Sequence, residues 1–144
     1  MRIQTKKHSY KIILRSAVLT GFMLALSGFA NAAVIDDVVA QLSNQGASPG
    51  QAEKGAAMWT KSFSANSKPL ERSCSTCHTR DLRNTGKHVK TGKPIKPMAP
   101  SVNSERLSDA KKIAKWLKRN CKWTLGRECT AQEKADVISY LRSL

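Results

Sequence analysis

The chain is 144 residues long and carries 25 Lys and Arg residues against 10 Asp and Glu, a formal net charge of +15. It has no internal repeat, no low-complexity tract and no stretch that alternates convincingly with period two, which argues against repeat and all-β architectures. Its cations are not interleaved with aromatic residues as on nucleic-acid-binding surfaces, so the charge indicates an acidic partner or plain solubility.

The first 32 residues have the order of an export signal. A basic start without acids precedes an apolar run from Ser16 to Phe29 and the small-x-small site Ala30-Asn31-Ala32. The run is too short to span a bilayer comfortably, which favours cleavage over an uncleaved anchor. We expect a periplasmic mature chain that starts at Ala33 and forms one small domain over 33–144 with no membrane span. Cleavage removes five of the 25 cations and none of the acids, leaving +10.

Two helices are expected before the centre of the chain. Val34 to Leu42 predicts a weak first helix. Ser48-Pro49 offers an N-cap and a proline at the first position of a second helix. Apolar or small residues then recur at helical spacing, namely Ala52, Gly55, Ala56, Trp59 and Phe63. Gly55 and Trp59 share one face, where a glycine lets another helix approach closely.

Residues 74–78 read Cys-Ser-Thr-Cys-His, the attachment motif of a covalent c-type haem. The thiols of Cys74 and Cys77 can form thioethers to the two vinyl groups of the porphyrin, and His78 can lie beneath the iron as proximal ligand. A thioredoxin-type dithiol would need a βαβ setting, which this chain lacks. A zinc site would need a second ligand pair, for which Cys121 and Cys129 are poorly spaced. We therefore predict one haem c per chain, attached outside the inner membrane, in agreement with export.

The remainder of the chain alternates loops and helices. Three prolines and two glycines predict an extended loop from Arg80 to Ser104. Ser108-Asp109 caps a third helix to about Asn120, with an inward face of Ile113, Ala114, Trp116 and Leu117. A loop from Cys121 to Cys129 follows. Thr130 then opens the last helix with a capping box, and its apolar stripe is Val137, Ile138, Leu141 and Leu144.

This order of helix, haem motif, loop, helix, loop and helix predicts an all-α fold of the class I cytochrome c type. In that fold the first and last of these helices cross beside the haem. We place the crossing where Gly55 and Trp59 meet Val137, Tyr140 and Leu141.

The distal iron ligand is not evident from spacing. Class I cytochromes use a methionine before the last helix, but the stretch from Ala99 to Leu144 contains none. Met98 follows His78 by only 20 residues in a proline-braced segment, and His88 follows it by ten. A lysine would have to be neutral to bind. Asn120 lies 42 residues after His78, at a suitable chain distance, although an asparagine that ends a helix is usually a cap.

Several further segments resemble one family of c-type cytochromes. They are Thr91-Gly-Lys93, Met98-Ala-Pro-Ser101, Lys115-Trp-Leu117, Arg119-Asn-Cys121 and the run from Leu125 to Asp136. With the haem motif they resemble sphaeroides haem protein, a small high-spin class I cytochrome, over roughly residues 48 to 144.

The resemblance implies a monohaem fold, Asn120 as a weak distal ligand that leaves the iron on reduction, and a disulfide between Cys121 and Cys129. It implies that the ferrous haem binds oxygen or nitric oxide and that a dihaem cytochrome c donates electrons. The chain departs from the family in carrying Met98, whose sulfur could compete for the iron or pack on the porphyrin.

Two classes of function follow from these observations. The first is an electron carrier that also binds small gases. The second is a haem enzyme acting on oxygen or nitric oxide, which would want a distal acid–base group. Near Asn120 only Arg119 and Lys122 are candidates for that group, so a carrier is favoured. An ordinary low-spin carrier with Met98 as ligand is a third, lesser reading.

Overall fold

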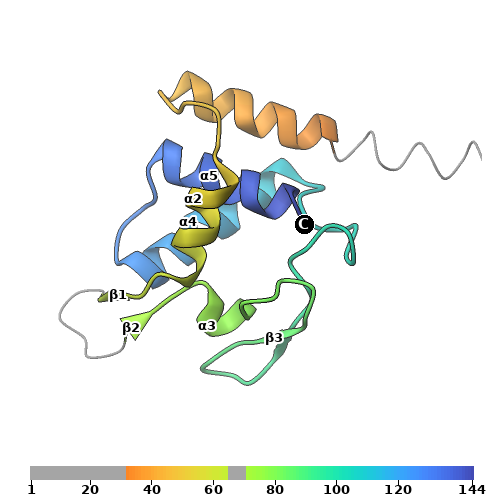
Figure 1. Ribbon diagram of the computed structural model, residues 1–144, viewed down its shortest axis with the longest axis vertical. Helices are drawn as coiled ribbons and strands as arrows, with labels where there is room; N and C mark the ends of the chain where they lie inside the picture. Colours follow the sequence, from red (N-terminus) through yellow and green to blue (C-terminus); the bar gives the residue numbers. More distant parts are fainter. Residues whose placement is uncertain (1–31, 65–70) are drawn as a thin grey trace, which may run out of the picture.

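The computed structural model describes residues 32–64 and 71–144, so all but the last residue of the predicted export signal (1–32) and most of the polar segment before the haem motif lie outside the described residues. Within them the protein is mostly helical, as predicted. A helix at 32–44 is followed by α2 (Ala52–Thr60), α3 (Ser75–His78), α4 (Ala110–Leu125) and α5 (Ala131–Arg142). The helix at 32–44 lies at one side of the molecule, and α3 lies near the other (Figure 1).

The predicted crossing of the second and last helices is confirmed, and α2 and α5 are packed together at unusually close range. A Cβ atom at Gly55 would lie 2.1 Å from the backbone oxygen of Asp136 and 2.7 Å from Cβ of Tyr140. One turn further on, the ring centroids of Trp59 and Tyr140 are 6.1 Å apart. Glycine at 55 is therefore required by the contact between the two backbones.

The start and end of α2 differ from the prediction. The helix begins at Ala52 rather than at Ser48-Pro49, because groups on α5 hold the preceding residues. The backbone N–H of Ser48 donates to Gln132 Oε1 at 2.8 Å, and that of Gln51 donates to Asp136 Oδ1 at 2.8 Å. At the other end Phe63 leaves the helix to pair with Arg72.

The predicted end of the third helix, at about Asn120, is also wrong. Helix α4 continues through Asn120 and Cys121 to Leu125, so the predicted loop from Cys121 to Cys129 is largely helical. Gly126 ends the helix in the left-handed conformation, with φ of 74°, which glycine adopts without the penalty a Cβ would bring. Asn120 is thus an interior residue of α4 and not a cap. The predicted caps Asp109 and Thr130, the latter with its capping box, are confirmed.

Two short antiparallel strand pairs interrupt the predicted loops. Strands β1 (Phe63–Ser64) and β2 (Glu71–Arg72) pair before the haem motif. Strands β3 (Gly86–Lys87) and β4 (Pro94–Ile95) pair within the segment predicted as an extended loop. Ladders of two residues are too short to leave an alternating pattern in the sequence.

The core consists of two connected clusters. In one, Ile35, Val38 and Leu42 of the first helix pack on Ile113, Ala135 and Ile138. The other contains Trp59, Leu82, Ala99, Val137 and Leu141. Ile113 is buried as predicted, but Ala114 and Trp116 are exposed, Trp116 to 47%. The inward face of α4 is narrower than predicted, because of the four predicted residues only Ile113 and Leu117, one turn apart, point toward the core.

No described helix has the length and apolar character needed to cross a membrane.

The contact at Gly55 generates a prediction about stability. Helix propensity alone would make Gly55→Ala stabilising by about 1 kcal/mol. The backbone oxygen of Asp136 cannot move aside, so we expect the opposite sign, a loss of roughly 1–3 kcal/mol. Urea unfolding of the holoprotein measures the change, and Lys54→Ala, at an exposed neighbour, should leave the midpoint nearly unaltered. A higher midpoint for Gly55→Ala would contradict the close approach.

Candidate haem site

A cavity of about 670 Å³ lies between the haem motif, α2, α4, α5 and the β3–β4 hairpin. Its wall brings together every site residue predicted from the sequence, namely Cys74, Cys77, His78, Asn120, Cys121 and Cys129. The alternative ligands Met98 and His88 line it as well, as does Met58. Its exposed lining is largely apolar, as a porphyrin requires.

The haem motif forms a short helical turn. Cys74 is the N-cap of α3, and its backbone oxygen accepts from the N–H of His78 at 3.1 Å. Immediately before it, the hydroxyl of buried Ser73 lies 2.8 Å from Ser75 Oγ and 3.0 Å from Thr76 Oγ1. Thr79 ends the turn with φ of 66°. The turn is therefore fixed by hydrogen bonds on both sides of the two thiols.

The backbone of the β3–β4 hairpin packs directly on this turn. A Cβ atom at Gly86 would lie 2.2 Å from the backbone oxygen of Cys77 and 3.0 Å from the Cα of His78. Glycine at 86 thus allows the hairpin to close over the motif.

His78 is held in an apolar setting without a polar partner. Its Nδ1 is buried and makes no hydrogen bond to any described residue. Burial lowers the pKa of His78 to about 4, and the positive charge of Arg106 adds to this effect. The imidazole is therefore neutral at pH 7, the form that binds metals. Its ring lies 5.7 Å from that of Trp59, whose Nε1 donates to the backbone oxygen of Thr79 at 3.0 Å.

These features fit a covalent haem. Cys74 and Cys77 take part in no disulfide, both line the cavity, and burial raises the pKa of the Cys74 thiol to about 11. A buried, unpartnered imidazole nitrogen beside an apolar space is costly unless a ligand completes the site. Two thiols, a neutral histidine and an apolar cavity are the donor set and shape that haem c needs.

Asn120 faces the same cavity from α4. It is half-buried, and its side-chain amide makes no hydrogen bond to any residue in 32–64 or 71–144. The next residue, Cys121, forms the predicted disulfide with Cys129, with Cα atoms 5.5 Å apart. The disulfide thus ties the turn of α4 that carries Asn120 to the start of α5.

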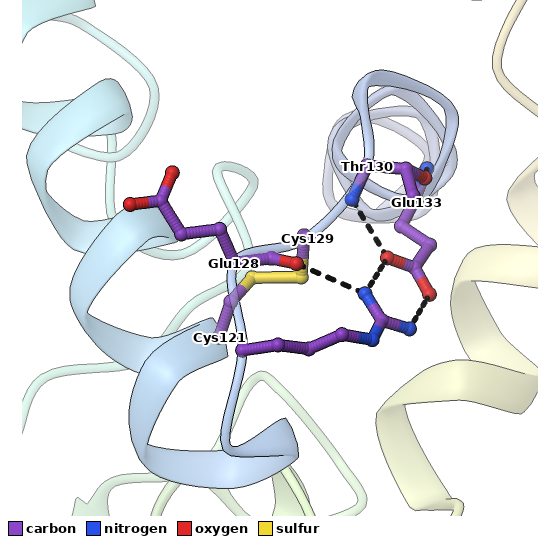
Figure 2. Close-up of polar contacts among 6 residues, drawn as sticks. Cys121, Glu128, Cys129, Thr130 and Glu133 are labelled. Atoms are coloured by element: carbon purple, nitrogen blue, oxygen red, sulfur yellow. Dashed lines mark hydrogen bonds and ion pairs between the residues drawn. A yellow bond between two sulfur atoms is a disulfide. The ribbon is translucent and has the colours of Figure 1, made fainter.

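Figure 2 shows that the residues that follow Cys129 at the start of α5 are held by further polar contacts. Glu133 accepts from the backbone N–H of Thr130 at 2.8 Å and from both terminal nitrogens of Arg127, at 2.7 and 2.6 Å. The capping box and the Arg127 guanidinium therefore hold the residues that follow Cys129.

The two alternative ligands, although they line the cavity, also make contacts of their own. Met98 packs against the core cluster of Trp59, Leu82, Ala99, Val137 and Leu141, and its backbone N–H donates to the oxygen of Leu82 at 2.8 Å. His88 is half-buried, and its Nδ1 accepts from the backbone N–H of Thr91 at 3.2 Å.

Arg106 is a cavity residue that the sequence did not reveal. Its Nε donates to the backbone oxygen of Pro97 at 2.8 Å, and Nη2 donates to that of Lys96 at 2.6 Å. Burial lowers its pKa. A single arginine in a chain with 25 cations gives no signal of such a position.

Comparisons with known proteins agree with this geometry. The family model of a domain of unknown function, DUF1924, matches residues 45–141. The cytochrome c-type protein SHP of Cereibacter sphaeroides is 38% identical over 131 residues, which cover 91% of this chain and 96% of SHP.

Solved structures give the same relationship. The structure of oxidised SHP, described as an oxygen-binding cytochrome c, has a TM-score of 0.70 at 36% identity and covers 76% of this chain and 96% of its own. Cytochrome c'' of Methylophilus methylotrophus is 31% identical in both its crystal and solution structures. Its TM-scores are 0.67 and 0.66, with 77% and 76% of this chain and 94% and 93% of those chains covered. The solution structure is described in terms of haem-ligand detachment.

Proposed function

Since this chain belongs to the family of the c-type cytochromes SHP and cytochrome c'' and matches its DUF1924 domain, we propose that it is an exported, high-spin electron carrier that also binds oxygen or nitric oxide when reduced. The observation that carries the proposal is the amide of Asn120, which lines the cavity of the haem motif and makes no hydrogen bond to the described residues. When bound, the haem would supply the one-electron chemistry, with His78 and Asn120 as the residues that would hold its iron.

His78 is the proximal ligand in this proposal. Its neutral imidazole can bind the metal through one ring nitrogen. The hydrogen-bonded turn from Cys74 to His78 fixes the position of the imidazole relative to the two cysteines. Trp59, fixed by its hydrogen bond to Thr79, lies beside the ring at a tilted angle of 48° and limits its rotation. His78 thus needs no further acid or base to serve as a ligand.

Asn120 is the weak distal ligand. An amide oxygen is a hard, neutral donor, so it suits ferric iron better than the softer ferrous iron. The absence of a hydrogen bond to the described residues leaves this amide free to bind and to move away. SHP is described as oxygen-binding and cytochrome c'' as detaching a haem ligand, which supports the same behaviour here.

Met98 is assigned to packing in this proposal. Its thioether belongs to the apolar cluster around Trp59, and its backbone is anchored on Leu82. Met98 also lines the cavity, so binding an iron there would compete with this apolar packing. This contrast with the free amide of Asn120 favours the asparagine.

A redox partner with an acidic surface is the second part of the proposal. Helix α4 forms one wall of the cavity and carries six cations and no acid, namely Lys111, Lys112, Lys115, Lys118, Arg119 and Lys122. Lys112 pairs with Asp109, while Lys118 and Lys122 pair with Glu128. The remaining charge would attract an acidic protein to this wall, and the dihaem cytochrome c implied by the family resemblance is the proposed donor.

Export is the third part. The residue order at 1–32 fits a cleaved signal, and haem attachment of the c type takes place outside the inner membrane. The periplasm is an oxidising compartment, in which the disulfide between Cys121 and Cys129 can persist.

Intact-mass measurement tests export and haem attachment together. The denatured, acidified protein should have the mass of a chain that begins at Ala33 plus one haem. A full-length chain recovered from membranes would contradict cleavage, and a mass without haem would contradict covalent attachment.

Optical spectra of two variants test the distal ligand. Asn120→Ala should alter the ferric spectrum and leave the ferrous spectrum nearly unchanged, because the amide binds only ferric iron. Met98→Leu should alter neither. The opposite result, a sulfur-to-iron charge-transfer band in the ferric wild type that Met98→Leu abolishes, would return the protein to the ordinary low-spin carriers.

Charge reversal on α4 tests the partner surface. Lys115→Glu should slow oxidation of the ferrous protein by the anion ferricyanide by roughly two- to threefold at low ionic strength, with the difference vanishing at high salt. Lys54→Glu makes the same change of net charge on α2 and is the matched control. Equal slowing in both variants would mean that only the net charge matters.

A further inference from the structure

Arg72 makes two contacts with one residue of α4. Its Nη1 donates to the backbone oxygen of Trp123 at 2.9 Å, and its guanidinium carbon lies 4.6 Å from the centroid of the Trp123 ring. Arginine suits this site because its planar guanidinium can stack on an indole while its N–H groups donate to a carbonyl.

The carbonyl that Arg72 binds would otherwise lack a helical partner. Trp123 belongs to the last four residues of α4, which ends at Leu125. The last four carbonyls of a helix have no intrahelical N–H to accept from and carry the negative end of the helix dipole. A cation at this position therefore both satisfies an acceptor and stabilises the end of the helix.

Arg72 also stands next to the haem motif. It is the last residue of β2, paired with Phe63 of β1, and the chain passes from it through buried Ser73 to Cys74. The contact thus ties the end of α4 to the haem-attachment turn, within two residues of the first thioether position.

Asn120 lies one helical turn before Trp123, and both line the cavity. On the other side, Cys121 is tied by its disulfide to the start of α5. The segment of α4 that carries Asn120 is therefore held at two points, by Arg72 and by the Cys121–Cys129 bond.

We propose that Arg72 is a positioning residue for the distal site, which sets the place of Asn120 relative to the haem-attachment turn and thereby how readily its amide leaves the iron. The inference rests on the proposed role of Asn120 and adds to it the residue that controls access. Without the Arg72 contact the end of α4 would move more freely, and the amide would occupy its binding position for a smaller fraction of the time.

Binding of imidazole to the ferric protein measures that occupancy, because an added ligand enters only when Asn120 is away. We expect Arg72→Ala to raise the apparent association rate by roughly tenfold, about the effect of losing one hydrogen bond and one partly buried cation–π contact. Arg72→Lys keeps the charge and a donor but not the planar stack, so a smaller increase is expected. Arg142→Ala is the control, since it removes the same charge and an ion pair with Asp36 and should leave the rate unchanged.

The decisive comparison repeats Arg72→Ala in an Asn120→Ala background. A positioning residue acts through Asn120, so the second substitution should then have no effect on the imidazole rate. The same increase in both backgrounds would reveal a general loosening of the structure and overturn the proposal. So would an Arg72→Ala rate equal to wild type.

These outcomes are separable from failure of the proposed function. If Asn120→Ala leaves the ferric spectrum unaltered, Asn120 is not the ligand and both proposals fall. If Asn120→Ala alters it while both Arg72 variants bind imidazole at the wild-type rate, only the role of Arg72 is lost. Should Arg72→Ala fail to retain haem, the milder Arg72→Lys variant in the two backgrounds supplies the same comparison.

Discussion

The close approach of α2 and α5 is the contact on which the haem cavity depends. At Gly50 and Gly55 a side chain would collide with the backbone of α5, 2.2 Å from the oxygen of Ala135 and 2.1 Å from that of Asp136. With the two backbones this near, Trp59 is directed from α2 toward His78, and Val137 and Leu141 of α5 reach the cavity wall. A larger separation would break the link between the helical crossing and the haem motif.

Polar groups at this crossing are satisfied within the protein. The buried carboxylate of Asp136 accepts from the backbone N–H of Gln51 at 2.8 Å and from Gln132 Nε2 at 2.9 Å. With the backbone N–H of Ser48, which donates to Gln132 Oε1, two backbone donors ahead of α2 find acceptors on α5, a role that a side-chain N-cap would otherwise fill. By contrast, among the buried side chains of residues 32–64 and 71–144, His78 Nδ1 at the haem site is left without a hydrogen-bond partner.

Helix α4 meets two requirements at once. It contributes Ile113 to the core and Asn120 to the cavity, and it carries six cations without an acid, of which Lys112 and Arg119 also line the cavity. Like charges on one helix repel one another, and Glu128 and Asp109 offset part of that repulsion. The end of the helix is held by the disulfide and by Arg72, so the most highly charged element is also fixed where it meets the haem site.

Much of the fold and part of the site followed from the sequence because their signals are local. The Cys74–His78 motif, the caps at Asp109 and Thr130, and the glycine face at Gly55 each depend on residues within one or two turns. The pairing of Cys121 with Cys129 and the role proposed for Asn120 came from family resemblance, since spacing alone left Met98 and His88 open.

Other features were decided only by contacts between distant segments. Helix α2 starts late because α5 satisfies its preceding backbone donors. The end of α4 at Gly126 is by contrast a local stop, which the prediction placed too early. The exposure of Trp116, the two-residue strand pairs and the burial of Arg106 likewise have no local signature. The sequence by itself determined the chemistry of haem attachment, because that chemistry needs five consecutive residues. The tertiary structure alone decided that Asn120, Met98 and His88 share one cavity with His78 and that Arg72 meets Trp123, because such contacts join segments that sequence spacing does not relate.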